Sequence, residues 1–185
     1  MSLNIRTGIA CLVLLAGTDF GLLSQEDRTP DVVYVGTPYD IVSAMLKMAR
    51  VKTGDLVYDL GCGDGRVLVL AAQRYGCRGL GYDIDPERVS AARLNALRGG
   101  VDHLVSIAQA DLFTLDFSNA DVLSLYLLPE INDKLLPKLR KLKPGARLVF
   151  HNYGLEDVEA ESSQEIISNE DNASHTIFLY TTPLK

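Results

Sequence analysis

The chain has 185 residues, of which 47% are hydrophobic and 23% are charged, and its formal net charge is -6. This length and composition fit one globular domain with a substantial core and exclude an intrinsically disordered chain. The acidic balance disfavours bulk binding to a nucleic-acid backbone, so we expect no nucleic-acid partner. A local basic groove within this total stays open as the alternative.

An apolar stretch lies near the N-terminus, where "TGIACLVLLAG" follows a short positive region. Its apolar run from Ile9 to Gly17 is well short of the ~20 residues that cross a bilayer. Three interpretations stay open: an anchor lying on a membrane, a degenerate export signal, or a helix packed on the domain. We assign residues 1–31 to this segment and its polar linker, and the domain proper to residues 32–185. We expect a cytoplasmic protein, with membrane association through this segment as the alternative.

The first element expected in the domain is a helix within residues 37–51. Thr37 is a suitable N-cap, and Pro38 suits the first helical position. Ile41 and Met45 follow at helical spacing, so that one apolar stripe faces the core.

Short apolar runs then alternate with helical patterns, which is typical of a parallel sheet covered by helices. We expect strands at 55–61, 77–85, 103–111, 120–128, 146–153 and 175–182. Helices are expected at 65–76, 86–98 and 129–145. Pro137 predicts a kink or a restart in the last helix. The final strand is a candidate hairpin partner for a strand near Ile166 and Ile167. The expected fold class is α/β, doubly wound, with a mostly parallel seven-stranded sheet and helices on both faces.

The stretch "DLGCGDGRV", which begins at Asp59, places three glycines between the first strand and its helix. In open α/β sheets, ligands bind beyond the carboxyl ends of such strands. The dinucleotide fingerprint G-x-G-x-x-G is not met, because Gly61, Gly63 and Gly65 are followed by Arg66. A P-loop is excluded, since no Gly-Lys-Ser/Thr follows.

Carboxylates also disfavour a pyrophosphate at this helix N-terminus, because Asp59 and Asp64 stand beside it. An acidic strand end next to bare backbone suits a ligand with an ammonium group, a sulfonium and a sugar, which is S-adenosyl-L-methionine. Cys62, inside the turn, is interpreted as a small side chain that fits there. The chain's three cysteines are too scattered for a disulfide framework or a zinc site, so no metal is expected.

From Tyr34 onward, the chain resembles the class I, Rossmann-like S-adenosylmethionine-dependent methyltransferases, whose D-x-G-x-G-x-G pattern is met by the glycine turn. The resemblance implies that Asp83, which ends the second strand, accepts hydrogen bonds from the ribose hydroxyls, with Ile84 beside it. It also implies that Asp111, in "QADLF", contacts the adenine amino group and that Leu112 contributes to an apolar wall. Taken alone, Asp83 also fits a solvated strand end, and Asp111 a turn residue.

A closer resemblance rests on "YVGTPYDIVSAMLKMARVKTGDLVYDLGCGDGR". This stretch is similar to the small protein-lysine N-methyltransferases that modify adenine nucleotide translocase and the c-subunit of ATP synthase, and to their bacterial relatives. It implies that Tyr34 and Thr37 close over the methionine end of the cofactor. The chain departs from the group in its short apolar stretch and in the acidic residues 156–172. These form either a solvated hairpin or a rim that attracts a cationic substrate.

The expected activity is methyl transfer to an amine, with a protein lysine as the acceptor. The alternatives are a small-metabolite N-, O- or S-methyltransferase and a catalytically silent S-adenosylmethionine-binding module. Tyr126, in "LYLLPE", either packs on the cofactor or acts on the substrate. His151 is interpreted as a hydrogen-bonded structural histidine rather than a base, and no catalytic residue is assigned. The Asp/Asn-Pro-Pro-Tyr/Phe motif of nucleic-acid amine methyltransferases is missing from "LYLLPE".

Overall fold

The computed structural model describes residues 34–185. Its helices are α1 (Tyr39–Met48), α2 (Arg66–Tyr75), α3 (Pro86–Arg98) and α4 (Pro129–Leu139). Its strands are β1 (Leu56–Leu60), β2 (Arg78–Asp83), β3 (Val105–Gln109), β4 (Val122–Leu125), β5 (Arg147–His151), β6 (Ser162–Ile167) and β7 (Ser174–Thr181). The alternation expected from the apolar runs is confirmed.

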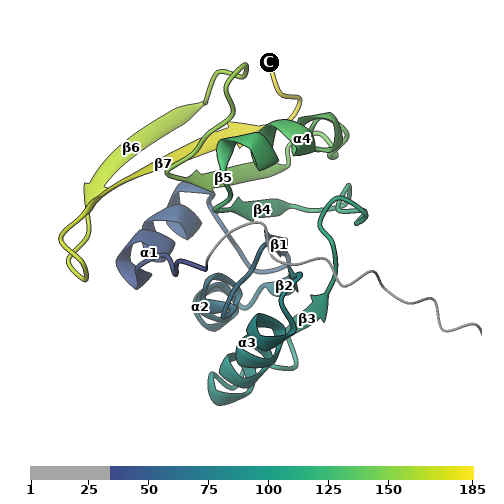
Figure 1. Ribbon diagram of the computed structural model, residues 1–185, viewed down its shortest axis with the longest axis vertical. Helices are drawn as coiled ribbons and strands as arrows, with labels where there is room; N and C mark the ends of the chain where they lie inside the picture. The colour runs from purple at the N-terminus through teal and green to yellow at the C-terminus, as the bar shows by residue number, and fades with distance from the viewer. Residues whose placement is uncertain (1–33) are drawn as a thin grey trace, which may run out of the picture.

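The strands form one seven-stranded sheet in the order β3-β2-β1-β4-β5-β7-β6 (Figure 1). Strands β1 to β5 are parallel, whereas β7 runs antiparallel to both β5 and β6. The switch point lies between β1 and β4. From β1, the chain adds β2 and β3 on one side of the sheet and then returns to add β4 and β5 on the other side. Such a switch point opens a crevice at the carboxyl ends of these two strands.

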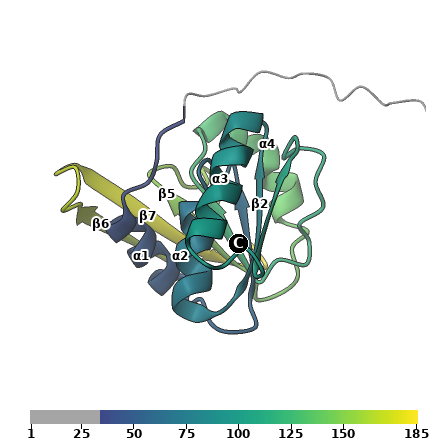
Figure 2. The same cartoon turned by 90° about the horizontal axis from the view of Figure 1, so that it is seen from below.

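Helices cover both faces of the sheet, as expected. Figure 2 shows α1, α2 and α3 side by side on one face and α4 on the other. Alternate residues of β1 serve the two layers, since Val57 packs with the first cluster and Tyr58 and Leu60 with the second. The two apolar layers hold the carboxyl ends of the central strands in a fixed arrangement.

Two local expectations were wrong. Thr37 is not the N-cap of α1: the helix begins at Tyr39 with Pro38 at the cap, and the side chain of this cap residue makes no hydrogen bond to the first turn. The Thr37 hydroxyl is instead hydrogen-bonded to His151, at the end of β5. Of the kink or restart expected at Pro137, the restart is wrong, because α4 runs through the proline to Leu139. The kink stays a prediction. The proline stands in the last turn, and the helix ends two residues after it.

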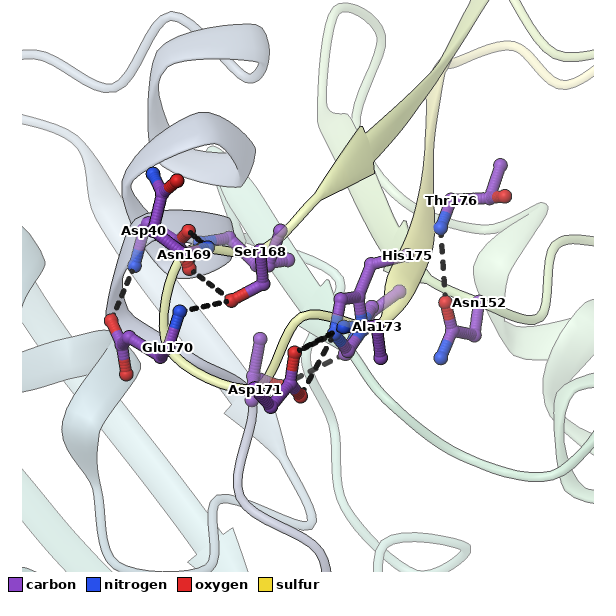
Figure 3. A network of polar contacts seen from close by, with 12 residues as sticks. Asp40, Asn152, Ser168, Asn169, Glu170, Asp171, Ala173, His175 and Thr176 are labelled. Atoms are coloured by element: carbon purple, nitrogen blue, oxygen red, sulfur yellow. Dashed lines mark hydrogen bonds and ion pairs between the residues drawn. The ribbon is translucent and has the colours of Figure 1, made fainter.

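The predicted hairpin is confirmed, with Ser162–Ile167 of β6 paired to β7. Its turn is fastened to the start of α1 (Figure 3). The Asp40 carboxylate accepts hydrogen bonds from Asn169 N at 2.8 Å and Ser168 Oγ at 3.0 Å, and Glu170 Oε1 accepts one from Asp40 N at 3.0 Å. Most of β6 is exposed, as a solvated hairpin requires.

The interpretations placed on residues 1–31, including the anchor, the export signal and the packed helix, lie outside the described residues. Within residues 34–185, none of the helices has the length and apolar character needed to cross a bilayer. The same residues contain no cluster of three or more His, Cys, Asp or Glu side chains arranged to hold a metal ion.

Candidate active site

A cavity of about 330 Å³ lies beyond the carboxyl ends of β1, β2 and β4. It is the crevice that the strand order predicts. Nearly all of the residues expected to bind the cofactor line it: Tyr34, Thr37, Asp59, Gly61, Cys62, Asp83, Ile84, Asp111, Leu112 and Tyr126. Gly63 is the exception, because the ring of Tyr34 covers it.

The glycine turn requires bare backbone at two positions. Gly61 has φ +72°, and a Cβ there would lie 3.0 Å from Leu127 Cδ2 at the cavity wall. Gly63 has φ +54°, and a Cβ there would lie 2.1 Å from Tyr34 Cε2. Any other residue would therefore combine an unfavourable backbone angle with lost space.

The Asp83 carboxylate holds the turn in place. Its Oδ2 accepts a hydrogen bond from Gly63 N at 2.8 Å, and its Oδ1 accepts one from Asp85 N at 3.0 Å. A carboxylate oxygen has two lone pairs, so each can accept a second hydrogen bond. Asp83 can therefore shape the turn and still receive the hydroxyl groups of a ribose.

Arg66 has a role that the sequence reasoning missed, since that reasoning used it only as evidence against a dinucleotide. Its guanidinium bonds the Asp64 carboxylate at 2.8 Å and donates to the Thr37 carbonyl at 2.9 Å. It also lies 5.1 Å from the centre of the Tyr39 ring. Arg66 thus holds residues 37–39 against the glycine turn. Asp64, two positions before it in the sequence, was the signal that could have predicted this ion pair.

Asp59 is the buried carboxyl group of the cavity. Burial raises its pKa to about 7, while a hydrogen bond with Ser124 acts in the opposite direction. Burial likewise raises the pKa of the Cys62 thiol, so Cys62 is a packing residue rather than a nucleophile. Both Asp59 and Cys62 therefore lose their protons at a higher pH than exposed side chains of the same type do.

The segments after β3 and β4 complete the wall. Asp111 Oδ1 accepts a hydrogen bond from Phe113 N at 2.9 Å, so Asp111 stabilises a turn as well as lining the cavity. The Tyr126 ring also lines the cavity, with its centre 4.0 Å from that of the His151 ring. His151 is fully buried, with hydrogen bonds at both ring nitrogens, which agrees with a structural histidine.

Asn132 of α4 was also missed. Its side chain is fully buried, and Nδ2 donates to the Tyr153 carbonyl at 3.1 Å. It therefore fixes the loop that follows β5, next to the aromatic part of the site. No short motif in the sequence marks such a contact between distant segments.

Known proteins with similar sequences are methyltransferases. The family model of the ANTKMT methyltransferase domain matches residues 59–162. The chain belongs to this methyltransferase family. A protein-lysine N-methyltransferase of Saccharolobus islandicus is 41% identical over 82% of this chain and 94% of its own length. The adenine nucleotide translocase lysine N-methyltransferase of Mus musculus is 37% identical over 67% of the chain, which spans 54% of that longer protein.

A solved structure shares the fold. The crystal structure of an RNA methyltransferase from Salinibacter ruber in complex with S-adenosyl-L-homocysteine has a TM-score of 0.76 and 41% identity. The match covers 80% of this chain and 94% of that one. The Rossmann-like methyltransferase fold expected from the sequence is therefore confirmed.

The protein is an S-adenosyl-L-methionine-dependent methyltransferase, and its cavity fits that cofactor. The glycine turn leaves backbone uncovered at Gly61, and Asp83 retains lone pairs for hydroxyl donors. When bound, the cofactor supplies a methyl group on a sulfonium, which a lone pair of the acceptor can attack. The individual contacts of Tyr34, Thr37, Ile84, Asp111, Leu112 and Tyr126 with the cofactor stay predictions.

We expect cofactor binding to release a proton from Asp59. Near its pKa of about 7, a large share of this carboxyl group is protonated. A cation in the cavity favours the carboxylate, so its pKa falls on binding and a proton leaves. Affinity should then rise with pH and level off above about pH 7. Calorimetry in buffers of different ionisation enthalpy, at about pH 6.5, measures the release.

The matched variants are Asp59→Asn, which should release no proton, and Asp85→Asn, which should release as much as the wild type. Asp85 also lines the cavity, and the oxygen of an asparagine there can still accept the hydrogen bond from Glu87 N. Binding by the wild type without proton release would show that the cofactor's charge does not reach Asp59.

Proposed function

We propose that this methyltransferase transfers the methyl group to the side-chain amine of a protein lysine. The observation that carries the proposal is the composition of the cavity wall, which has five carboxyl groups, of which Asp59 is partly protonated near pH 7, and two guanidinium groups. The carboxyl groups belong to Asp59, Asp64, Asp83, Asp85 and Asp111, and the guanidinium groups to Arg66 and Arg88. Such a wall attracts a cationic acceptor and repels phosphate.

The relatives support the same acceptor. The protein-lysine N-methyltransferase of Saccharolobus islandicus has nearly the same length as the matched region, so the likeness extends over almost all of that enzyme. The lysine N-methyltransferase of Xenopus laevis that is named for the c-subunit of ATP synthase is 35% identical over 78% of this chain and 65% of its own length. Lysine is thus the acceptor named both for a relative that the match covers almost completely and for a longer relative.

RNA is the second candidate, because the 41% identical protein from Salinibacter ruber is described as an RNA methyltransferase. The two relatives are equally similar to this chain, so identity alone does not choose between them. The net charge of -6 and the acidic cavity favour the amine. A direct assay decides between the two acceptors.

The assay uses the full chain, methyl-labelled S-adenosyl-L-methionine and an extract of cells that lack the gene. We expect the label in macromolecules that protease degrades and ribonuclease leaves intact, and in methyl-lysine after acid hydrolysis. The matched control is Gly61→Val, which lacks the bare backbone of the cavity. Label that ribonuclease releases would establish the RNA acceptor instead.

Two further outcomes separate the remaining alternatives. Label in the low-mass fraction would identify a small-metabolite methyltransferase. Tight cofactor binding with no transfer to any fraction would identify a silent binding module. We place the activity in the cytoplasm, where S-adenosyl-L-methionine is made.

A further inference from the structure

Four side chains form a continuous hydrogen-bonded chain that begins at the cavity. Thr37 Oγ1 lies 3.0 Å from His151 Nδ1, and His151 Nε2 lies 2.8 Å from His175 Nδ1. His175 Nε2 lies 3.1 Å from Asp171 Oδ2, and Figure 3 shows these last two residues in contact. We call these four residues the Thr37–Asp171 chain.

The Thr37–Asp171 chain connects four segments and runs from the cavity to the surface. Thr37 precedes α1, His151 ends β5, His175 lies in β7 and Asp171 belongs to the β6–β7 turn. Thr37, His151 and His175 are 6%, 0% and 7% exposed, whereas the Asp171 side chain is 44% exposed. The buried members therefore exchange hydrogen bonds with one another in a dry environment, where their donor and acceptor roles are well defined.

The Asp171 carboxylate fixes the direction of every hydrogen bond in the chain. The Ala173 N–H, followed by the contact with His175, lowers the pKa of Asp171, so it is ionised and can only accept. When the His175 ring is neutral, it donates from Nε2 to this carboxylate and accepts at Nδ1. His151 must accordingly donate from Nε2 and accept at Nδ1, which leaves Thr37 as the donor. Burial lowers the pKa of His151 to about 4, so this ring stays neutral.

The direction determines what Thr37 offers to the cavity. Its hydroxyl hydrogen is used by His151, and its carbonyl accepts from Arg66. What remains on Oγ1 is its two lone pairs, which can only accept hydrogen bonds. Other titratable or charged groups beside the chain are Asp40 of α1, Glu170 of the turn and Tyr126 after β4.

We propose that the Thr37–Asp171 chain is a positioning device that presents Thr37 Oγ1 as the acceptor for an N–H of the amine to be methylated. This inference rests on the proposed amine acceptor. A neutral amine has N–H groups and a single lone pair, so fixing an N–H direction also aims the lone pair. Aligning that lone pair with the methyl group lowers the entropic part of the barrier. Thr37 thereby contacts the acceptor amine through its Oγ1.

The direction of the hydrogen bonds in the Thr37–Asp171 chain can be measured without an assay of methyl transfer. The protein contains three histidines, and the one outside the Thr37–Asp171 chain, His103, is exposed and serves as an internal reference. Long-range ¹H–¹⁵N spectra at about pH 8.5, well above the ordinary histidine pKa of about 6.5, report the protonated nitrogen of each ring. We expect His151 and His175 to carry their protons on Nε2. A proton on His151 Nδ1 would overturn the proposal.

Asp171→Asn, at the surface end of the Thr37–Asp171 chain, should reverse the direction of its hydrogen bonds. Asp171 Oδ1 accepts from Ala173 N at 2.9 Å, and the asparagine oxygen would keep that bond. Its NH₂ group would then face His175 Nε2 and donate to it. The His151 proton should consequently move from Nε2 to Nδ1. The control is Glu165→Gln, which removes a carboxylate of the same hairpin that bonds Ser174 and should leave the His151 proton on Nε2.

The consequence for the amine is tested with n-butylamine, which mimics the lysine side chain. It is titrated into the full chain saturated with S-adenosyl-L-homocysteine. Thr37→Val and Asp171→Asn should each weaken n-butylamine binding about tenfold, the loss expected for one hydrogen bond. Thr37→Ser keeps the hydroxyl and should bind as the wild type does. Asp171 does not line the cavity, so Asp171→Asn should leave the affinity for S-adenosyl-L-homocysteine unchanged.

The outcomes keep this inference apart from the proposed function. If Thr37→Val weakens S-adenosyl-L-homocysteine and leaves n-butylamine binding unchanged, Thr37 serves the cofactor and the inference fails, while lysine methylation can still stand. If the tautomers and n-butylamine binding are as expected but extracts show methylated RNA, the acceptor proposal fails and the directed chain is retained.

Discussion

Gly61→Val is expected to abolish binding of S-adenosyl-L-methionine, with an affinity loss of at least about 100-fold, or ~2.7 kcal/mol. Gly61 lines the cavity at φ +72°, and a Cβ there would lie 3.0 Å from Leu127 Cδ2. The remaining valine methyl groups would occupy space that the cofactor needs. Calorimetric titration of the folded variant measures the loss.

Gly76→Val is the matched control for backbone strain. Gly76 ends α2 at φ +63°, and a Cβ there would meet no atom within 4 Å. Each variant should lose about 1–2 kcal/mol of unfolding free energy from the left-handed backbone. Only Gly61→Val should lose the cofactor. Equal affinities in the two variants would mean that the turn does not approach the ligand.

Asp83→Ala is expected to weaken cofactor binding by about 2 kcal/mol, or about 30-fold, and to destabilise the fold by a similar amount. The substitution leaves Gly63 N and Asp85 N without their acceptor, and it removes the lone pairs available to the ribose hydroxyls. Calorimetry measures the affinity, and urea denaturation measures the free energy of unfolding.

Asp121→Ala separates the two effects. Asp121 Oδ2 also accepts a backbone hydrogen bond, from Leu56 N at 2.8 Å, but at the opposite end of β1 from the cavity. It should lower the unfolding free energy and leave cofactor affinity unchanged. If Asp83→Ala behaved in the same way, its ribose role would be wrong and only the turn would depend on it.

Much of the fold could be predicted because its signals are local. Apolar runs bounded by glycine and proline located the strands, and Gly76 and Pro86 marked helix boundaries that the structure confirms. The glycine turn and the acid at the end of β2 lie close together in sequence, so their spacing carries most of the geometry. This part of the site could therefore be predicted from the sequence alone.

The rest depends on contacts between distant segments. His151 and His175 meet because β5 and β7 are antiparallel neighbours, a pairing that no local pattern specifies. The sequence predicts the Thr37 hydroxyl at a helix cap, because serine and threonine favour that place, yet His151, 114 residues away, bonds it instead. Arg66 likewise acts on a carbonyl 29 residues away.

The place of β7 in the sheet has a consequence for biosynthesis. This strand is the last of the described elements along the chain, yet it lies inside the sheet between β5 and β6. A nascent chain that has been translated only as far as β6 therefore lacks the strand that joins β6 to the rest. It also lacks His175, so the docking of the hairpin and the completion of the Thr37–Asp171 chain must both wait until β7 has left the ribosome.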